Sequence, residues 1–177
     1  MGTRIVFETH SITDDNERGV ATGWLPGRLS QDGRRLAVGL GRRRRDDVEA
    51  VFTSDLRRAV ETAELAYADA TVPVLMDWRL RECDYGDLNG APVDQVHGDR
   101  AAFLDTAYPG GESWRAAVER AGRFLDDVPL RWDGRRVLVI GHLATRWALD
   151  HRLAGTPVER LVDEEFGWQP GWEYLLP

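Results

Sequence analysis

Near the start of the chain stands RIVFETHSITDDN, residues 4–16. Its first part, Ile5 to Phe7, is β-branched and aromatic, which indicates a buried strand. Its second part is a loop of hydrogen-bonding side chains that begins at His10. Similar apolar runs recur at residues 49–53, 72–76, 136–140 and 172–176. Segments with helical spacing separate them, so the sequence predicts an α/β/α sandwich around a mainly parallel sheet.

The helices between these strands are predicted from apolar spacing and capping residues. Ser30 is expected to cap a helix through about Arg45, with Leu36, Ala37 and Leu40 on one face. Ser54 or Asp55 is expected to cap a helix running to about Tyr67. Further helices are predicted at residues 93–106, 112–127 and 143–153.

Composition limits the classes of function. A length of 177 residues predicts one domain over residues 1–177, and a net charge of -7 argues against nucleic-acid binding. No apolar run approaches the roughly 18 residues of a membrane span, so no membrane partner is expected. The single cysteine, Cys83, and the lack of a signal-peptide profile predict a cytoplasmic protein. The absence of lysine excludes Schiff-base and Walker-type chemistry.

Two of the four histidines directly follow predicted strands. His10 comes after IVFET and His142 after VLVIG, whereas His97 and His151 fall in a loop and a helix. Because the carboxyl ends of parallel strands meet at one edge of a sheet, His10 and His142 are expected to lie together there. That edge is where an α/β protein of this kind carries its chemistry.

Two further motifs follow the second and third strands: SDLRRAVETAE (residues 54–64) and LRECDYGDLNG (residues 80–90). With them the sequence resembles the histidine phosphatase superfamily, whose fold is called phosphoglycerate mutase-like. The resemblance spans nearly the whole chain. The matching positions are His10, Thr13 and Asn16 after the first strand, Ser54, Leu56, Arg58, Ala59, Thr62 and Ala63 after the second, Leu80, Glu82, Gly86 and Gly90 in the next loop, and Gly141 and His142 after the late strand.

The resemblance implies a phosphatase that acts on a small phosphorylated metabolite through a phosphohistidine. His10 would be the nucleophile, and Arg58 and His142 would hold the phosphoryl oxygens. Glu82 would protonate the leaving oxygen and later deprotonate water. No metal or cofactor is implied. The remaining candidates for phosphate or substrate binding are Thr9, Thr13, Asn16, Trp24 and Arg28.

One position departs from the family pattern. An arginine normally precedes the nucleophilic histidine, but this chain has Thr9, and Ser11 replaces the usual glycine. A neutral hydroxyl in place of a bidentate, charge-assisted contact costs about 1.5–3 kcal/mol unless another group compensates. Arg28 and Arg146 are the candidates for that compensation.

Two alternative functions therefore stay open. One is a catalytically weakened relative that binds an anionic ligand or a protein partner. The other is a metal-dependent hydrolase, because Glu8 and His10 lie two residues apart on one strand and would share a face with His142 and Glu82.

Overall fold

The computed structural model describes residues 2–177, and these residues form a five-stranded sheet in the order β3-β2-β4-β1-β5. The strands are β1 (Thr3–Thr9), β2 (Ala50–Thr53), β3 (Val74–Met76), β4 (Arg136–Gly141) and β5 (Trp172–Leu176). The first four run parallel, and β5 pairs antiparallel with β1. The loops that carry His10 and His142 follow β1 and β4, which are parallel neighbours, so both loops leave the same edge of the sheet.

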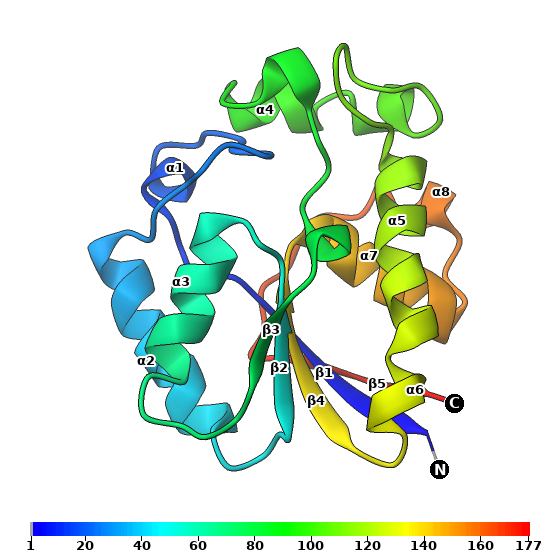
Figure 1. Ribbon diagram of the computed structural model, residues 1–177. Helices are drawn as coiled ribbons and strands as arrows, with labels where there is room; N and C mark the ends of the chain where they lie inside the picture. Colours follow the sequence, from blue (N-terminus) through cyan, green and yellow to red (C-terminus); the bar gives the residue numbers. More distant parts are fainter. Residues whose placement is uncertain (1) are drawn as a thin grey trace.

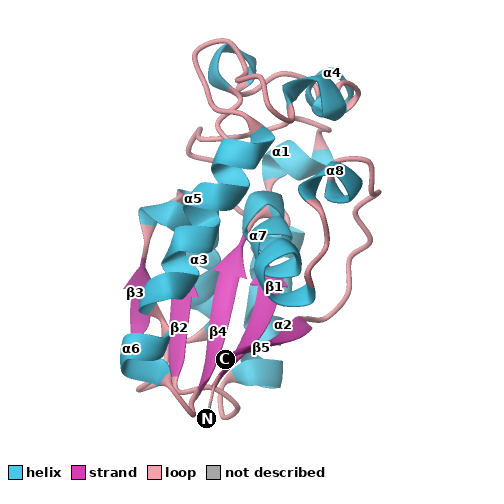
Figure 2. Cartoon of the chain, turned by 90° about the vertical axis from the view of Figure 1, so that its right-hand side faces the viewer, coloured by secondary structure: helices cyan, strands magenta, loops and turns pink. Residues whose placement is uncertain are grey.

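Helices cover both faces of this sheet, as predicted (Figures 1 and 2). On one face lie α2 (Gln31–Arg44) and α3 (Arg57–Ala66); on the other lie α5 (Trp114–Asp127), α6 (Pro129–Trp132) and α7 (Leu143–Ala154). Alternation along β1 divides the core: Val6 packs with the α2 and α3 side, and Ile5 and Phe7 pack with the α5 and α7 side. The result is a three-layer α/β/α sandwich.

Short elements gather beyond the carboxyl ends of the strands. Figure 1 shows α1 (Asp14–Glu17) and α4 (Val93–His97) above the sheet. The other short elements are the 3₁₀ turns η1 (Trp78–Leu80), η2 (Gly86–Leu88) and η3 (Arg100–Phe103), and the helix α8 (Val158–Leu161). The single helix predicted over residues 93–106 was wrong: α4 ends before Gly98, a residue of low helix propensity, and η3 follows separately.

The start of α3 also differs from the prediction. The helix begins at Arg57 with Leu56 at its N-cap, and neither Ser54 nor Asp55 caps it. Both side chains have tertiary partners instead: the Ser54 hydroxyl lies 2.7 Å from Nε2 of His142, and the Asp55 carboxylate accepts two hydrogen bonds from Arg81. Ser54 and Asp55 therefore form hydrogen bonds with side chains of other elements and do not cap α3.

The capping of α2 agrees with the prediction, because the Ser30 side chain accepts a hydrogen bond from the backbone of Gly33. Along the helix, Ala37 and Leu40 are buried, whereas Leu36 is 49% exposed. Within residues 2–177, every helix is too short or too polar to cross a membrane.

A close backbone contact joins α2 to the loop that carries His10. At Gly33 an added Cβ would lie 1.8 Å from the carbonyl oxygen of Ile12, and the Gly33 carbonyl accepts a 2.6 Å hydrogen bond from the Ser11 hydroxyl. We expect Gly33→Ala to lower the free energy of unfolding by about 1–3 kcal/mol, because the backbone of the loop must move.

Gly39 of the same helix is the matched control. A Cβ there would meet only the tip of Arg43 at 3.8 Å, so Gly39→Ala should raise the free energy of unfolding by about 0.5–1 kcal/mol through helix propensity. Urea unfolding of both variants measures the difference. Equal effects of the two substitutions would show that the loop does not depend on this contact.

Candidate active site

His10 follows the end of β1, where its backbone N–H donates to the carbonyl of Gly141 at 2.9 Å. Its Nδ1 lies 2.7 Å from the carbonyl oxygen of Ser11. Because a carbonyl only accepts, Nδ1 carries the ring proton and Nε2 keeps its lone pair. Burial, assisted by the Arg58 guanidinium, lowers the pKa of His10 to about 3, so the imidazole is neutral at physiological pH.

Arg58 stands between the two histidines. It belongs to the first turn of α3 and is 2% exposed. Its Nε lies 3.3 Å from Nε2 of His10, and its Nη2 lies 3.3 Å from Nδ1 of His142. Two backbone carbonyls, those of Gly23 and Leu25, accept further hydrogen bonds from the guanidinium and fix its plane. A buried, immobilised cation thus lies beside Nε2 of His10.

His142 is the N-cap of α7, directly after β4. Its Nδ1 accepts from Arg58, so its proton lies on Nε2, which donates to the Ser54 hydroxyl at 2.7 Å. Burial and the Arg58 charge hold the pKa of His142 well below its usual range. The two imidazole rings lie 5.0 Å apart between centroids, which confirms that both strand-end histidines share one site.

Glu82 lies in the loop after η1 and faces the same site. Its carboxylate accepts hydrogen bonds from the backbone N–H groups of Cys83, Leu143 and Ala144, at 2.9, 3.2 and 3.1 Å. The last two belong to the first turn of α7, which fixes the carboxylate beside His142. Burial raises the pKa of Glu82, and these N–H donors together with Arg58 offset only part of that rise.

A cavity of about 870 Å³ opens above these groups. His10, Glu82 and His142 line it, as do Thr9 and Asn16, and Arg58 lies behind the two histidines. A group bound in this cavity would meet a neutral imidazole and a carboxyl group whose pKa is raised, with the Arg58 guanidinium in contact with both imidazoles. These are the components of nucleophilic attack, charge stabilisation and proton transfer.

The other predicted binding residues are placed differently. Thr13 is buried and caps α1 in a reciprocal box with Asn16, so its hydroxyl shapes the loop. Trp24 donates from Nε1 to the carbonyl of Glu82 at 2.7 Å and stacks under Arg81, and it is not among the residues that line the cavity. Trp24 therefore positions the backbone of Glu82.

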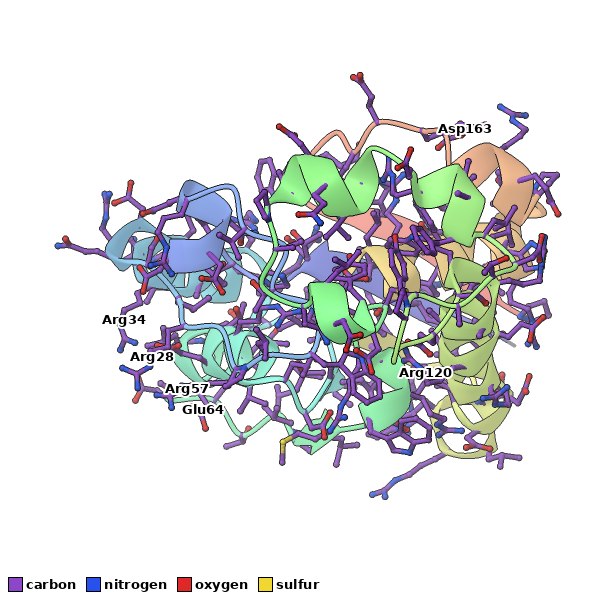
Figure 3. All side chains as sticks on the ribbon, turned by 90° about the horizontal axis from the view of Figure 1, so that it is seen from above. Arg28, Arg34, Arg57, Glu64, Arg120 and Asp163 are labelled. Atoms are coloured by element: carbon purple, nitrogen blue, oxygen red, sulfur yellow. The ribbon has the colours of Figure 1, made fainter. Side chains whose placement is uncertain are left out.

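Neither arginine considered as a replacement for the missing one reaches the cavity. Arg28 is exposed, and in Figure 3 it lies at the outer edge of the molecule with Arg34 and Arg57. Arg146 pairs with Asp150 at 3.2 Å and lies 4.3 Å over the ring of Trp172. The cations that do line the cavity are Arg43 and Arg100, which the sequence did not indicate.

Arg120 is a second residue that sequence reasoning missed. Its side chain is 4% exposed, and in Figure 3 its label lies within the outline of the molecule, unlike those of Arg28, Arg34 and Arg57 at the edge. The guanidinium bonds the carboxylate of Glu112 and donates to the carbonyls of Arg79, Arg81 and Glu82. It thereby holds the loop that carries Glu82. The only signal in the sequence was the separation of Glu112 and Arg120 by about two helical turns.

The carboxylate expected in a metal site is engaged elsewhere. Glu8 is 2% exposed and is held by Arg43 at 3.2 Å and by Arg44 at 3.1 Å. Glu82, the second expected carboxylate, accepts backbone hydrogen bonds at both oxygens. Over residues 2–177 no three histidine, cysteine or acidic side chains are grouped so as to hold a metal ion.

Comparison with known families identifies the superfamily to which the fold belongs. The family model of the histidine phosphatase superfamily (branch 1) matches residues 5–167. The chain belongs to the histidine phosphatase superfamily. The match includes His10, Arg58, Glu82 and His142, and it confirms the resemblance found in the sequence.

Relatives within the superfamily include both mutases and phosphatases. A 2,3-bisphosphoglycerate-dependent phosphoglycerate mutase of Streptococcus pneumoniae is 28% identical over 203 aligned positions, covering 92% of this chain and 88% of the mutase. The solved structure of Bacillus stearothermophilus YhfR is similar with a TM-score of 0.82 and 26% identity, covering 95% of this chain and 88% of that one. The structure of a mycobacterial glucosyl-3-phosphoglycerate phosphatase in complex with VO3 is similar with a TM-score of 0.79 and 28% identity. The similarity covers 90% of this chain and 85% of that one.

Proposed function

We propose that this protein is a phosphoric monoester hydrolase that works through a phosphohistidine at His10. The observation that carries the proposal is the environment of Nε2 of His10: it keeps a lone pair, its ring has a pKa of about 3, and it lies 3.3 Å from the Arg58 guanidinium. A nucleophile must be unprotonated when it attacks, and the phosphoryl group needs a cation where its negative charge accumulates.

The proposed reaction has two displacements. Nε2 of His10 attacks phosphorus, and the ester P–O bond breaks while Glu82 gives its proton to the leaving oxygen. Water then attacks the same phosphorus, Glu82 takes a proton from it, and the P–N bond breaks to release phosphate. Arg58 and His142 stabilise the phosphoryl oxygens in both steps. Atoms and charge balance without another reactant.

Hydrolysis is favoured over mutase chemistry by the segment above the site. Only residues 91–110 separate the loop of Glu82 from the approach to α5, and they form the short elements α4 and η3. The cavity beneath them holds about 870 Å³, which leaves room for the water that the second displacement needs. The weakened, ligand-binding alternative rests on the two departures from the family pattern, Thr9 and Ser11.

Thr9 lines the cavity beside His10, and neither Arg28 nor Arg146 supplies the guanidinium that the family has at this position. We therefore expect Thr9→Arg to raise kcat/KM for 4-nitrophenyl phosphate by at least about tenfold, because it adds a charge-assisted contact to the phosphoryl group. Thr9→Ala is the control and should change kcat/KM by no more than about fivefold, the value of one neutral hydrogen bond.

Release of inorganic phosphate measures all three proteins. A loss of activity in Thr9→Arg would mean that another cation already serves this position, and Arg43 is then the candidate. No phosphate release by wild type or either variant, from this or other monoesters, would contradict the hydrolase and support the ligand-binding alternative.

A further inference from the structure

The cavity has an apolar wall above its polar floor. Four large apolar side chains that are exposed to solvent line it: Ile12 (40%), Leu36 (49%), Phe166 (45%) and Trp168 (61%). They come from the loop after β1, from α2 and from the segment before β5, which lie far apart in the sequence. Exposed apolar side chains that converge from separate segments on one cavity are typical of a binding surface.

This wall is continuous with the catalytic floor. Leu40, on α2, and Leu143, at the start of α7, also line the cavity. Leu143 is the residue after His142, and its backbone N–H donates to the Glu82 carboxylate. A ligand with its phosphoryl group at His10 would therefore extend its remaining part along apolar surface.

The charged residues of the wall do not favour a second anionic group. Arg43 is paired with Glu8 at 3.2 Å. Arg100 donates to the carbonyl of Glu164 at 3.2 Å, and the carboxylate of Glu165 lines the same cavity. The net charge of the whole chain is -7, which further disfavours the approach of a multiply charged anion.

We propose that the substrates are phosphate monoesters of alcohols with a bulky apolar part, such as an aromatic ring on a short alkyl chain. This inference rests on the proposed phosphatase function and adds the substrate class to it. A cavity of about 870 Å³ accommodates such a group. The smaller phosphoglycerates would leave Phe166 and Trp168 uncovered, and their carboxylate would enter a cavity that Glu165 also lines.

Three alkyl phosphates test the substrate class: 3-phenylpropyl phosphate, propyl phosphate and glycerol 3-phosphate. Their leaving alkoxides need similar protonation by Glu82, so differences in kcat/KM between the esters reflect contacts with the apolar wall. We expect kcat/KM for the phenylpropyl ester to exceed that for the other two by at least about tenfold, chiefly through a lower KM, because the ring is transferred from water to the wall.

Variants of residues in the wall provide a second test of the substrate class. Phe166→Ala and Trp168→Ala should each raise KM for 3-phenylpropyl phosphate at least about fivefold and leave kcat/KM for propyl phosphate within about twofold. Leu130→Ala is the matched control, since Leu130 is 84% exposed and lies on α6, at the opposite end of the sheet (Figure 1). All three positions are exposed, so the variants are expected to fold.

Phosphonates separate this inference from the proposed function. The P–C bond of 3-phenylpropylphosphonate cannot be hydrolysed, so calorimetry compares its affinity with that of propylphosphonate even in an inactive protein. Tighter binding of the phenylpropyl compound, lost in Phe166→Ala or Trp168→Ala, supports the wall. Equal affinities, together with equal kcat/KM for the three esters, would overturn the inference while leaving the phosphatase intact.

Discussion

His10→Ala is expected to reduce phosphatase turnover at least about a thousandfold. The variant loses the atom that receives the phosphoryl group, and Arg58 and His142 alone can only orient it. Steady-state release of phosphate from a monoester measures the effect. His151→Ala is the control, because His151 is exposed and its Nδ1 bonds the nearby carbonyl of Thr156, away from the cavity.

Trapping of the intermediate makes the same prediction specific. Brief mixing of the wild-type protein with substrate should add one phosphoryl group to the peptide that contains His10, stable at alkaline pH and lost in acid. Mass spectrometry of a digest prepared at neutral or alkaline pH would locate it. Metal-dependent activity at the wild-type level in His10→Ala would refute the assignment of the nucleophile.

The lowered pKa of His10 sets the acid side of the pH profile. A free imidazole becomes protonated as the pH falls through about 6.5 and then cannot attack. In this site the pKa is about 3, so the nucleophile stays unprotonated well below that pH. The cause of this lowered pKa is first the burial of the imidazole and second the guanidinium of Arg58, and both make protonation of His10 unfavourable.

The parts of the site that could be predicted from sequence are those fixed by sheet topology. His10 and His142 each follow a central parallel strand, so their meeting at one edge required only the correct assignment of β1 and β4. Arg58 belongs to the same group, because the first turn of α3 begins where β2 ends. The family resemblance then assigned chemical roles to residues already placed by topology.

The contributions that sequence could not show depend on where loops and long side chains point. Arg28 and Arg43 are both arginines, yet one extends into solvent and the other lines the cavity. Helical spacing places Leu36 on one face of α2 with Ala37 and Leu40, but it does not show that Leu36 lines the cavity while Ala37 is buried in the core. The apolar residue Leu36 therefore lies at the cavity and outside the core.

Glu82→Gln is expected to slow the cleavage of esters with poor leaving groups much more than that of esters with good leaving groups. For alkyl phosphates, kcat/KM should fall by about a hundred- to ten-thousandfold, because the alkoxide must be protonated as it leaves. For 2,4-dinitrophenyl phosphate the first step should proceed nearly as in the wild type, since that phenolate leaves without a proton. The second step would be slow because no carboxylate deprotonates water. The variant should thus release one equivalent of phenolate rapidly and then stall as phosphohistidine.

The pH dependence supplies the check on the role of Glu82. The acid must be protonated to act, so wild-type activity on alkyl phosphates should be lost as the pH rises through the pKa of Glu82, which burial has raised. Glu82→Gln should lack this loss, and Glu119→Gln, at an exposed carboxylate on α5, should keep it. A rapid burst of one equivalent also shows that the variant is folded, since it requires His10 and Arg58 to be in place. If alkyl and dinitrophenyl esters slow by the same factor, without a burst, Glu82 does not transfer the proton and serves only to orient the start of α7.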